Sequence, residues 1–171
     1  MNLVPLNQFV QLFTLADAAA TERVSERLAL VLRDPAAYQE EFAEELAERD
    51  IVAGLPAQEL RDVALIDALL SEGLLWEGSM REPTQALAEG INEVLALQRR
   101  IAFLDESALA RRRNTGPDVL DELQDALEPQ GLALVLFTLD SDSYPLGVVA
   151  QAQADDARAL ASQLGFTLAV Y

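Results

Sequence analysis

Apolar residues recur at intervals of three and four positions through the N-terminal half of the chain, which is the spacing of one face of an α-helix. Proline suits the first turn of a helix, because its fixed φ is helical and its missing N–H would have no partner there. The pattern predicts helices that begin at Pro5, near Thr21, at Asp34-Pro35, after Pro56 and at Pro83. The N-terminal half is therefore expected to be helical.

Two short apolar segments in this half show no clear period. Leu74-Leu75-Trp76 is expected to form either a short strand or a docking loop. Residues 99–106 either continue the helix before them or form a strand, and a run this short fits both periods.

The pattern changes after residue 116. An unbroken apolar run from Leu132 to Leu139 is typical of a central strand. The expected order is a helix (117–131), that strand, a turn (140–145), a strand (146–150), a helix that ends at Gly165 and a strand (166–171). Helices and strands in this order form a two-layer α-β-β-α-β module.

We therefore predict an α+β fold, in which a helical N-terminal half packs on a small C-terminal α-β-β-α-β module with a mostly antiparallel sheet. Residues 1–171 are expected to form a single domain. Within it, residues 1–110 are the helix-rich part, residues 111–115 the connecting loop and residues 116–171 the α/β part.

The composition removes several classes of chemistry. The chain has no His and no Cys, and all 12 of its basic residues are Arg. Ser-His-Asp and Cys-His catalysis, thiolate metal sites and lysine Schiff bases are thereby excluded. What remains is carboxylates, hydroxyls and guanidinium groups, so the sequence favours a non-catalytic protein.

The chain is strongly acidic, with 29 acids against 12 Arg and a net charge of −17. Such a charge repels nucleic acid and anionic membranes, and it attracts basic proteins. Solubility alone would also explain an acidic surface. We expect no cofactor, no nucleic-acid or membrane partner, and a basic protein as the candidate partner.

The sequence lacks the features of a secreted or membrane-spanning protein. Residues 1–13 have neither the positive charge nor the continuous apolar run of a secretory signal, and no apolar window is long enough to cross a bilayer. We therefore expect a cytoplasmic protein. A homo-oligomer that buries the Trp76 segment or a sheet edge is also compatible with the sequence.

One candidate ligand site lies in the turn after the apolar strand. Asp140, Asp142 and Tyr144 could together hold a weakly bound Mg²⁺ or Ca²⁺ ion, or a phosphate-bearing ligand, and such a site could be enzymatic. The alternative is a structural hairpin turn, in which Asp and Ser side chains bond the nearby backbone.

Two further clusters are candidates for binding. Arg111, Arg112 and Arg113 precede a predicted helix N-terminus, so they could bind an anion, or they could pair with the chain's own acids. An acidic helix face and the single tryptophan could contact a partner, or they could be a solvated face and a core residue. The residues concerned are Glu40, Glu41, Glu44, Glu45, Glu48 and Trp76.

Three segments together resemble a bacterial family of unknown function. They are Ala64-Leu65-Ile66-Asp67-Ala68-Leu69, Leu74-Leu75-Trp76-Glu77 and Leu139-Asp140-Ser141-Asp142-Ser143-Tyr144-Pro145-Leu146. The resemblance covers residues 50–171 and implies that Asp67, Trp76, Asp140, Asp142 and Tyr144 are the positions to test. In size and charge, the chain is also similar to small acidic bacterial immunity proteins, which neutralise basic toxin domains.

Overall fold

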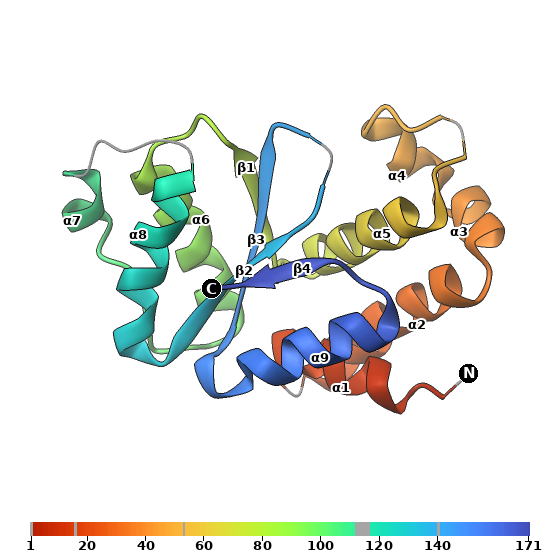
Figure 1. Ribbon diagram of the computed structural model, residues 1–171, viewed down its shortest axis with the longest axis horizontal. Coiled ribbons are helices and arrows are strands. Elements are labelled where there is room, and N and C mark those ends of the chain that lie inside the picture. Colours follow the sequence, from red (N-terminus) through yellow and green to blue (C-terminus); the bar gives the residue numbers. More distant parts are fainter. Residues whose placement is uncertain (1, 16, 53, 112–116, 140) are drawn as a thin grey trace.

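The computed structural model describes residues 2–15, 17–52, 54–111, 117–139 and 141–171 (Figure 1). The helices are α1 (Val4–Thr14), α2 (Ala18–Arg33), α3 (Pro35–Glu41), α4 (Ala43–Glu48), α5 (Ala57–Ser71), α6 (Thr84–Leu97), α7 (Glu106–Ala110), α8 (Pro117–Leu127) and α9 (Ala154–Leu164). The strands are β1 (Trp76–Ser79), β2 (Leu132–Phe137), β3 (Ser143–Ala150) and β4 (Leu168–Val170). The predicted α+β fold, with a helical N-terminal half, is confirmed.

The sheet has the strand order β1-β3-β2-β4, and each neighbouring pair is antiparallel. One of its edge strands comes from the helical half of the chain. In the pairing of β1 with β3, Trp76 lies opposite Leu146 and Ser79 lies opposite Ser143. The sheet is therefore built from both halves, and Trp76 starts a strand rather than ending one.

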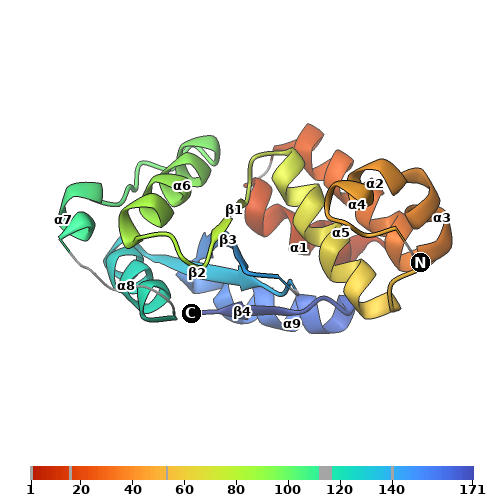
Figure 2. The ribbon, with the colours of Figure 1, turned by 90° about the horizontal axis from the view of Figure 1, so that it is seen from above.

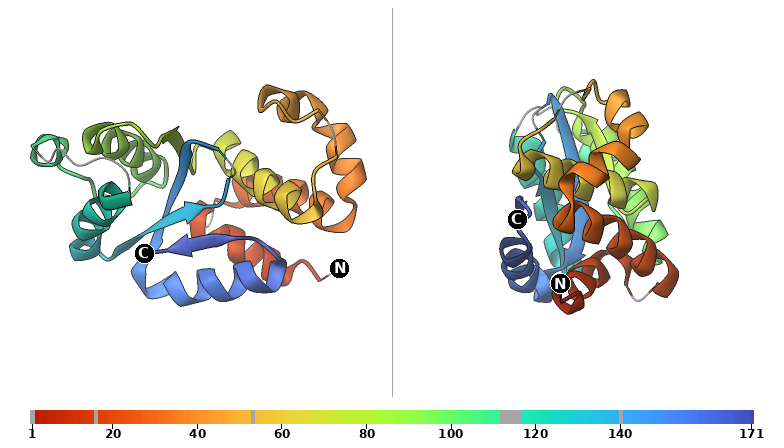
Figure 3. Two further views of the ribbon diagram at one scale, coloured as in Figure 1. Left: turned by 45° about the horizontal axis from the view of Figure 1, so that its top comes forward. Right: turned by 90° about the vertical axis from the view of Figure 1, so that its right-hand side faces the viewer.

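Helices cover both faces of the sheet, so the prediction of a two-layer module was wrong. Successive side chains of a strand point to opposite faces, and in β2 Val135 joins the core made with α1, α2, α5 and α9, while Leu134 joins the core made with α6, α7 and α8. Figure 2 shows these two groups of helices on either side of the strands. Figure 3 shows α1 and α9 side by side, although they come from opposite ends of the chain.

Aspartate caps fix two of the early helix starts. The Asp17 carboxylate accepts a hydrogen bond from the Ala20 N–H at 3.1 Å, so α2 begins before the predicted Thr21. Asp34 accepts one from the Ala37 N–H at 3.1 Å, as its sequence position predicts. The helix that follows is broken at Phe42, which separates α3 from α4.

Residues 99–105 are neither helix nor strand, so both predictions for 99–106 were wrong. Arg99 ends the turn after α6 in the left-handed region, with φ of 57°. The short helix α7 then begins after Asp105, whose carboxylate accepts a hydrogen bond from the Ala108 N–H at 3.1 Å. Sequence periodicity did not indicate this helix, because it has little more than one turn.

Candidate functional site

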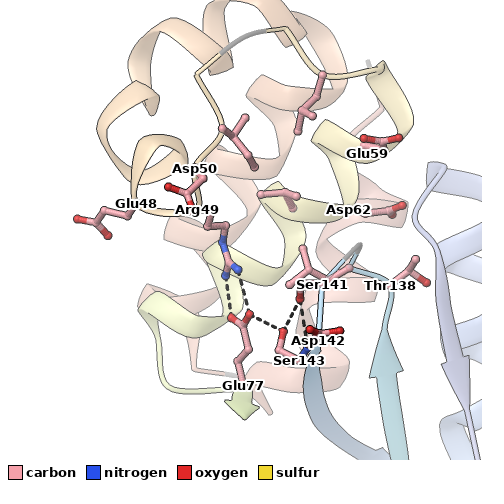
Figure 4. A pocket seen from close by; sticks show the side chains of 14 residues that line it. Glu48, Arg49, Asp50, Glu59, Asp62, Glu77, Thr138, Ser141, Asp142 and Ser143 are labelled. Atoms are coloured by element: carbon pink, nitrogen blue, oxygen red, sulfur yellow. Dashed lines mark hydrogen bonds and ion pairs between the residues drawn. The ribbon is translucent and has the colours of Figure 1, made fainter. Parts of the chain in front are cut away.

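A cavity of about 690 Å³ lies where the helical half meets the open end of the sheet. The residues after α4, the first turns of α5, the start of β1 and the turn between β2 and β3 form its walls (Figure 4). We call it the acidic pocket. Its lining residues are Glu48, Arg49, Asp50, Ile51, Leu55, Glu59, Asp62, Val63, Glu77, Thr138, Leu139, Ser141, Asp142 and Ser143.

Arg49, at the end of α4, joins three elements beside this pocket. Its Nε and Nη2 atoms donate to Asp67 Oδ1 of α5 at 2.8 and 2.6 Å. Its Nη1 and Nη2 atoms donate to the two carboxylate oxygens of Glu77 in β1 at 3.0 and 2.8 Å. A bidentate guanidinium–carboxylate pair fixes geometry as well as charge, so Arg49 holds α4, α5 and β1 in one arrangement.

The same network continues into the turn before β3. The Ser143 hydroxyl donates to Glu77 Oε1 at 2.9 Å, and the hydroxyls of Ser141 and Ser143 are 2.7 Å apart. Figure 4 shows this line of contacts from Arg49 through Glu77 to the two serines. The turn is therefore anchored to the helical half through side chains.

Burial and hydrogen bonding act in opposite directions on the pKa values of the acids in the network. Burial raises the pKa of Asp67, although hydrogen bonds from Arg49 oppose the shift. Burial acts in the same direction on Glu77, but there the hydrogen bonds from Arg49 and Ser143 prevail, so the pKa of Glu77 is lowered. Hydrogen bonding to Glu77 and Asp67 raises the pKa of Arg49, which stays charged.

A second polar cluster, formed by Arg27, Tyr38 and Glu45, interacts electrostatically with Asp67 of the Arg49 network. Arg27 of α2 donates through Nε to the Tyr38 hydroxyl at 3.1 Å and pairs with Glu45 of α4. Burial raises the pKa of Tyr38 to about 12, and the negative charge of Asp67 adds to this shift. The Oδ2 atom of Asp67 is buried and accepts no hydrogen bond from the described residues.

The charged side chains of the pocket lining that have no partner among the described residues are negative. In the described ranges, no hydrogen bond or ion pair involves the side-chain carboxylates of Glu48, Asp50, Glu59 or Asp142, whereas Arg49 is paired. Ile51, Leu55, Val63 and Leu139 give the same pocket an apolar wall. Carboxylates beside apolar surface suit a ligand that combines a cation with an apolar stem.

Asp62 also lines the pocket, but its carboxylate is occupied. It accepts hydrogen bonds from the Thr167 N–H at 2.8 Å and from the side chain of Gln58 at 3.1 Å. Gln58 Nε2 also donates to the Gly165 carbonyl at 2.8 Å. This cluster fixes the chain before β4 against α5, so Asp62 has a structural role.

The structure separates the members of the candidate site in the turn. Asp142 is exposed and lines the acidic pocket, whereas Tyr144 is buried in the core beside α6 and α8. Asp140 lies outside the described residues. Among the described residues, no group of three or more acidic side chains is arranged to hold a metal ion.

The other predicted binding residues are scattered. Trp76 is half-buried, and its ring covers Gly78 of β1 and Gly90 of α6. Arg111 is exposed at the end of α7, while Arg112 and Arg113 lie outside the described residues. Glu40, Glu41, Glu44, Glu45 and Glu48 are all exposed; Glu45 pairs with Arg27, and only Glu48 lines the pocket.

Sequence reasoning missed Arg49 and Glu77 as members of a site. One signal was present: Arg49 is the only basic residue between Arg33 and Arg61, and it directly follows the acidic segment 40–48. A single arginine in such a segment is expected to form an ion pair with a carboxylate. Its actual partners come from residues 18 and 28 positions further along the chain, which spacing does not reveal.

The fold and the site define an α+β protein with an acidic pocket beside a partly buried arginine–carboxylate network. A sequence model of a domain of unknown function, DUF6630, matches residues 5–171, and the chain belongs to that family. The predicted membership of an uncharacterised family is thereby confirmed, and the match extends well beyond residues 50–171. No significant similarity to a curated protein or to a solved structure was found.

The Arg49 network connects the three segments that carried the family resemblance. Asp67 comes from the first segment, Glu77 from the second, and Ser141 and Ser143 from the third. Segments far apart in the chain therefore meet at one wall of the acidic pocket. No helix among the described residues is long and apolar enough to cross a membrane.

Proposed function

We propose that this protein is a non-catalytic, cytoplasmic binding protein that docks a basic polypeptide in its acidic pocket. The observation that carries the proposal is the pocket lining. Four carboxylates without partners among the described residues, those of Glu48, Asp50, Glu59 and Asp142, stand around an apolar wall. An arginine or lysine side chain of the partner would rest its alkyl stem on that wall and pair its charged head with the carboxylates.

The acidic surface around the pocket would assist the encounter. The exposed acids of α3 and α4 lead from Glu40 to Glu48 at the pocket rim, and the whole chain carries a net charge of −17. Charge of one sign over a surface speeds the association of an oppositely charged partner, and salt screens this effect. The association rate would therefore fall as the salt concentration rises.

The test is the affinity for a fluorescent peptide of alternating arginine and leucine, measured by anisotropy. The pocket variant Glu59→Gln/Asp142→Asn removes two of the carboxylates. The control variant Glu93→Gln/Asp125→Asn removes the same charge from exposed positions on α6 and α8. We expect about tenfold weaker binding by the pocket variant, corresponding to about 1.4 kcal/mol, and little change in the control. Equal weakening of both variants would show that net charge, not the pocket, binds the peptide.

The second candidate, a weakly bound divalent cation at the turn, draws on fewer groups. Of its two predicted ligands among the described residues, Asp142 lines the pocket and Tyr144 is buried. A thermal-shift screen with Mg²⁺ and Ca²⁺ tests it, because a ligand that binds only the folded state raises the melting temperature. A rise that is lost in Asp142→Asn would support this candidate.

A further inference from the structure

The last residue of α6 and the loop between α6 and α7 present large apolar side chains to solvent. The exposed fractions of Leu97, Ile101 and Phe103 are 51%, 99% and 67%. The next residue, Leu104, points inward and is buried. We call residues 97–103 the apolar strip. Side chains this large and this exposed are typical of surfaces that bind another protein.

Two amide side chains hold the end of the apolar strip in place. Gln130 accepts a hydrogen bond from the Phe103 N–H at 3.1 Å and donates one to the Phe103 carbonyl at 2.9 Å. Asn92 bonds the N–H and carbonyl of Leu104 in the same way, at 2.7 and 3.0 Å. The exposed side chains of Ile101 and Phe103 therefore stand on or beside a fixed backbone, and a partner would not have to order it.

The strip also carries positive charge without any acid. Arg99 and Arg100 lie within it, and the sequence from Ala96 to Leu104 contains no Asp or Glu. Arg99 is exposed, and in the described ranges its side chain makes no ion pair. The strip thus combines a free guanidinium with apolar side chains, which is the chemistry that the acidic pocket fits.

The strip of one molecule cannot reach the pocket of the same molecule. The strip lies at one end of the sheet: Gln98 donates to the carbonyl of Val148 near the end of β3, and Phe103 bonds Gln130 just before β2. The pocket lies at the opposite end, where the turn between β2 and β3 lines it. A strip can therefore enter a pocket only between two copies.

We propose that the acidic pocket of one copy receives the apolar strip of a second copy. This inference rests on the proposed function, because it names the basic polypeptide as another molecule of the same chain. Arg99 would meet the carboxylates of Glu59 and Asp142, while Ile101 and Phe103 would cover the apolar wall. The two surfaces of the contact differ, so the assembly is head-to-tail and either grows or closes into a ring.

The net charge of −17 opposes this contact at long range but not at short range. At about 0.15 M salt the Debye length is about 8 Å, so the overall repulsion between copies is largely screened while direct ion pairs remain. The sedimentation experiments therefore use this salt concentration. The melting temperature of each variant serves as the check on its fold.

The test is analytical ultracentrifugation of the wild type and of two variants. The pocket variant is Glu59→Gln/Asp142→Asn and the strip variant is Ile101→Ser/Phe103→Ser; all four positions are exposed, so both variants should fold. We expect the wild type to associate across the micromolar range. Each variant alone should associate at least about tenfold more weakly than the wild type.

Mixing the two variants gives the most specific result. The intact pocket of the strip variant can take the intact strip of the pocket variant, so the mixture should form a dimer with one copy of each. A monomeric wild type, or a mixture with no dimer, would overturn the inference. Peptide binding by that same wild type would leave the proposed function standing, whereas its loss would overturn both.

Discussion

Replacing Arg49 with methionine is the sharpest test of the network at the pocket wall. The substitution keeps most of the side-chain volume and removes the cation that two carboxylates share. Without that cation, the negative charges of Asp67 and Glu77 would repel each other. Their side chains are 10% and 20% exposed, and that of Arg49 is 19% exposed, so water can replace little of what is lost.

The magnitude follows from the cost of breaking a buried pair. Removing one partner of a fully buried ion pair costs about 3–5 kcal/mol. Because all three side chains keep some contact with water, we expect about 2–4 kcal/mol for Arg49→Met. A chain of this size loses about 2–4 °C in melting temperature per kcal/mol. The variant should therefore melt about 4–16 °C below the wild type.

Urea denaturation followed by the fluorescence of the only tryptophan, Trp76, measures this directly. Arg81→Met is the matched control, since Arg81 is exposed and its side chain makes no ion pair in the described ranges. The triple variant Arg49→Met/Asp67→Asn/Glu77→Gln should recover much of the loss, because it leaves no unpaired charge. A cost below about 0.5 kcal/mol for Arg49→Met, the size of an ordinary surface substitution, would refute the reasoning.

Three further predictions follow from individual contacts. Gly90→Ala should destabilise by about 1–3 kcal/mol in the same urea assay, because a Cβ there would lie 2.2 Å from the Trp76 ring. Glu77→Gln should destabilise at neutral pH, and the difference from wild type should begin to shrink below about 4.5 and disappear once the pH has fallen through the folded-state pKa of Glu77, which is lowered from that value. Gln98→Leu should cost about 1–3 kcal/mol in thermal unfolding, because the buried amide of Gln98 donates to the carbonyls of Phe13 and Val148 at 3.1 Å each.

The helical half of the fold was predictable because its signals are local. Asp34 followed by Pro35 indicated a helix start, and Asp34 caps α3 in the structure. The strand β2 was likewise visible as an unbroken apolar run. These features depend on residues within a few positions of one another, so one sequence is enough to reveal them.

The sheet topology was less predictable because strand pairing is non-local. The pairing of Trp76 with Leu146 joins positions 70 residues apart, and neither segment specifies the other. The start of β3 at Ser143 rather than Leu146 had a further consequence. Tyr144 takes the alternation of Leu146 and Val148 and points into the core with them, away from Asp142.

The candidate site was predictable in part. Asp67 and Asp142 were singled out by the family resemblance, and the structure places them at the Arg49 network and the pocket. Arg49 itself was not singled out. The local sequence of an exposed arginine in an acidic segment is the same as that of a partly buried arginine that pairs with two distant carboxylates. Only the folded positions of α5 and β1 distinguish them.

The most direct test of the central claim is to map where a basic peptide binds. Amide chemical shifts of the labelled protein, recorded while the arginine–leucine peptide is added, report the contact residue by residue. The account predicts changes concentrated at residues 48–51, 59–63, 138–139 and 141–143, around the acidic pocket. Changes spread over all the acidic helices, or centred on α8 or α9, would contradict it and leave the negative charge as a general property of the surface.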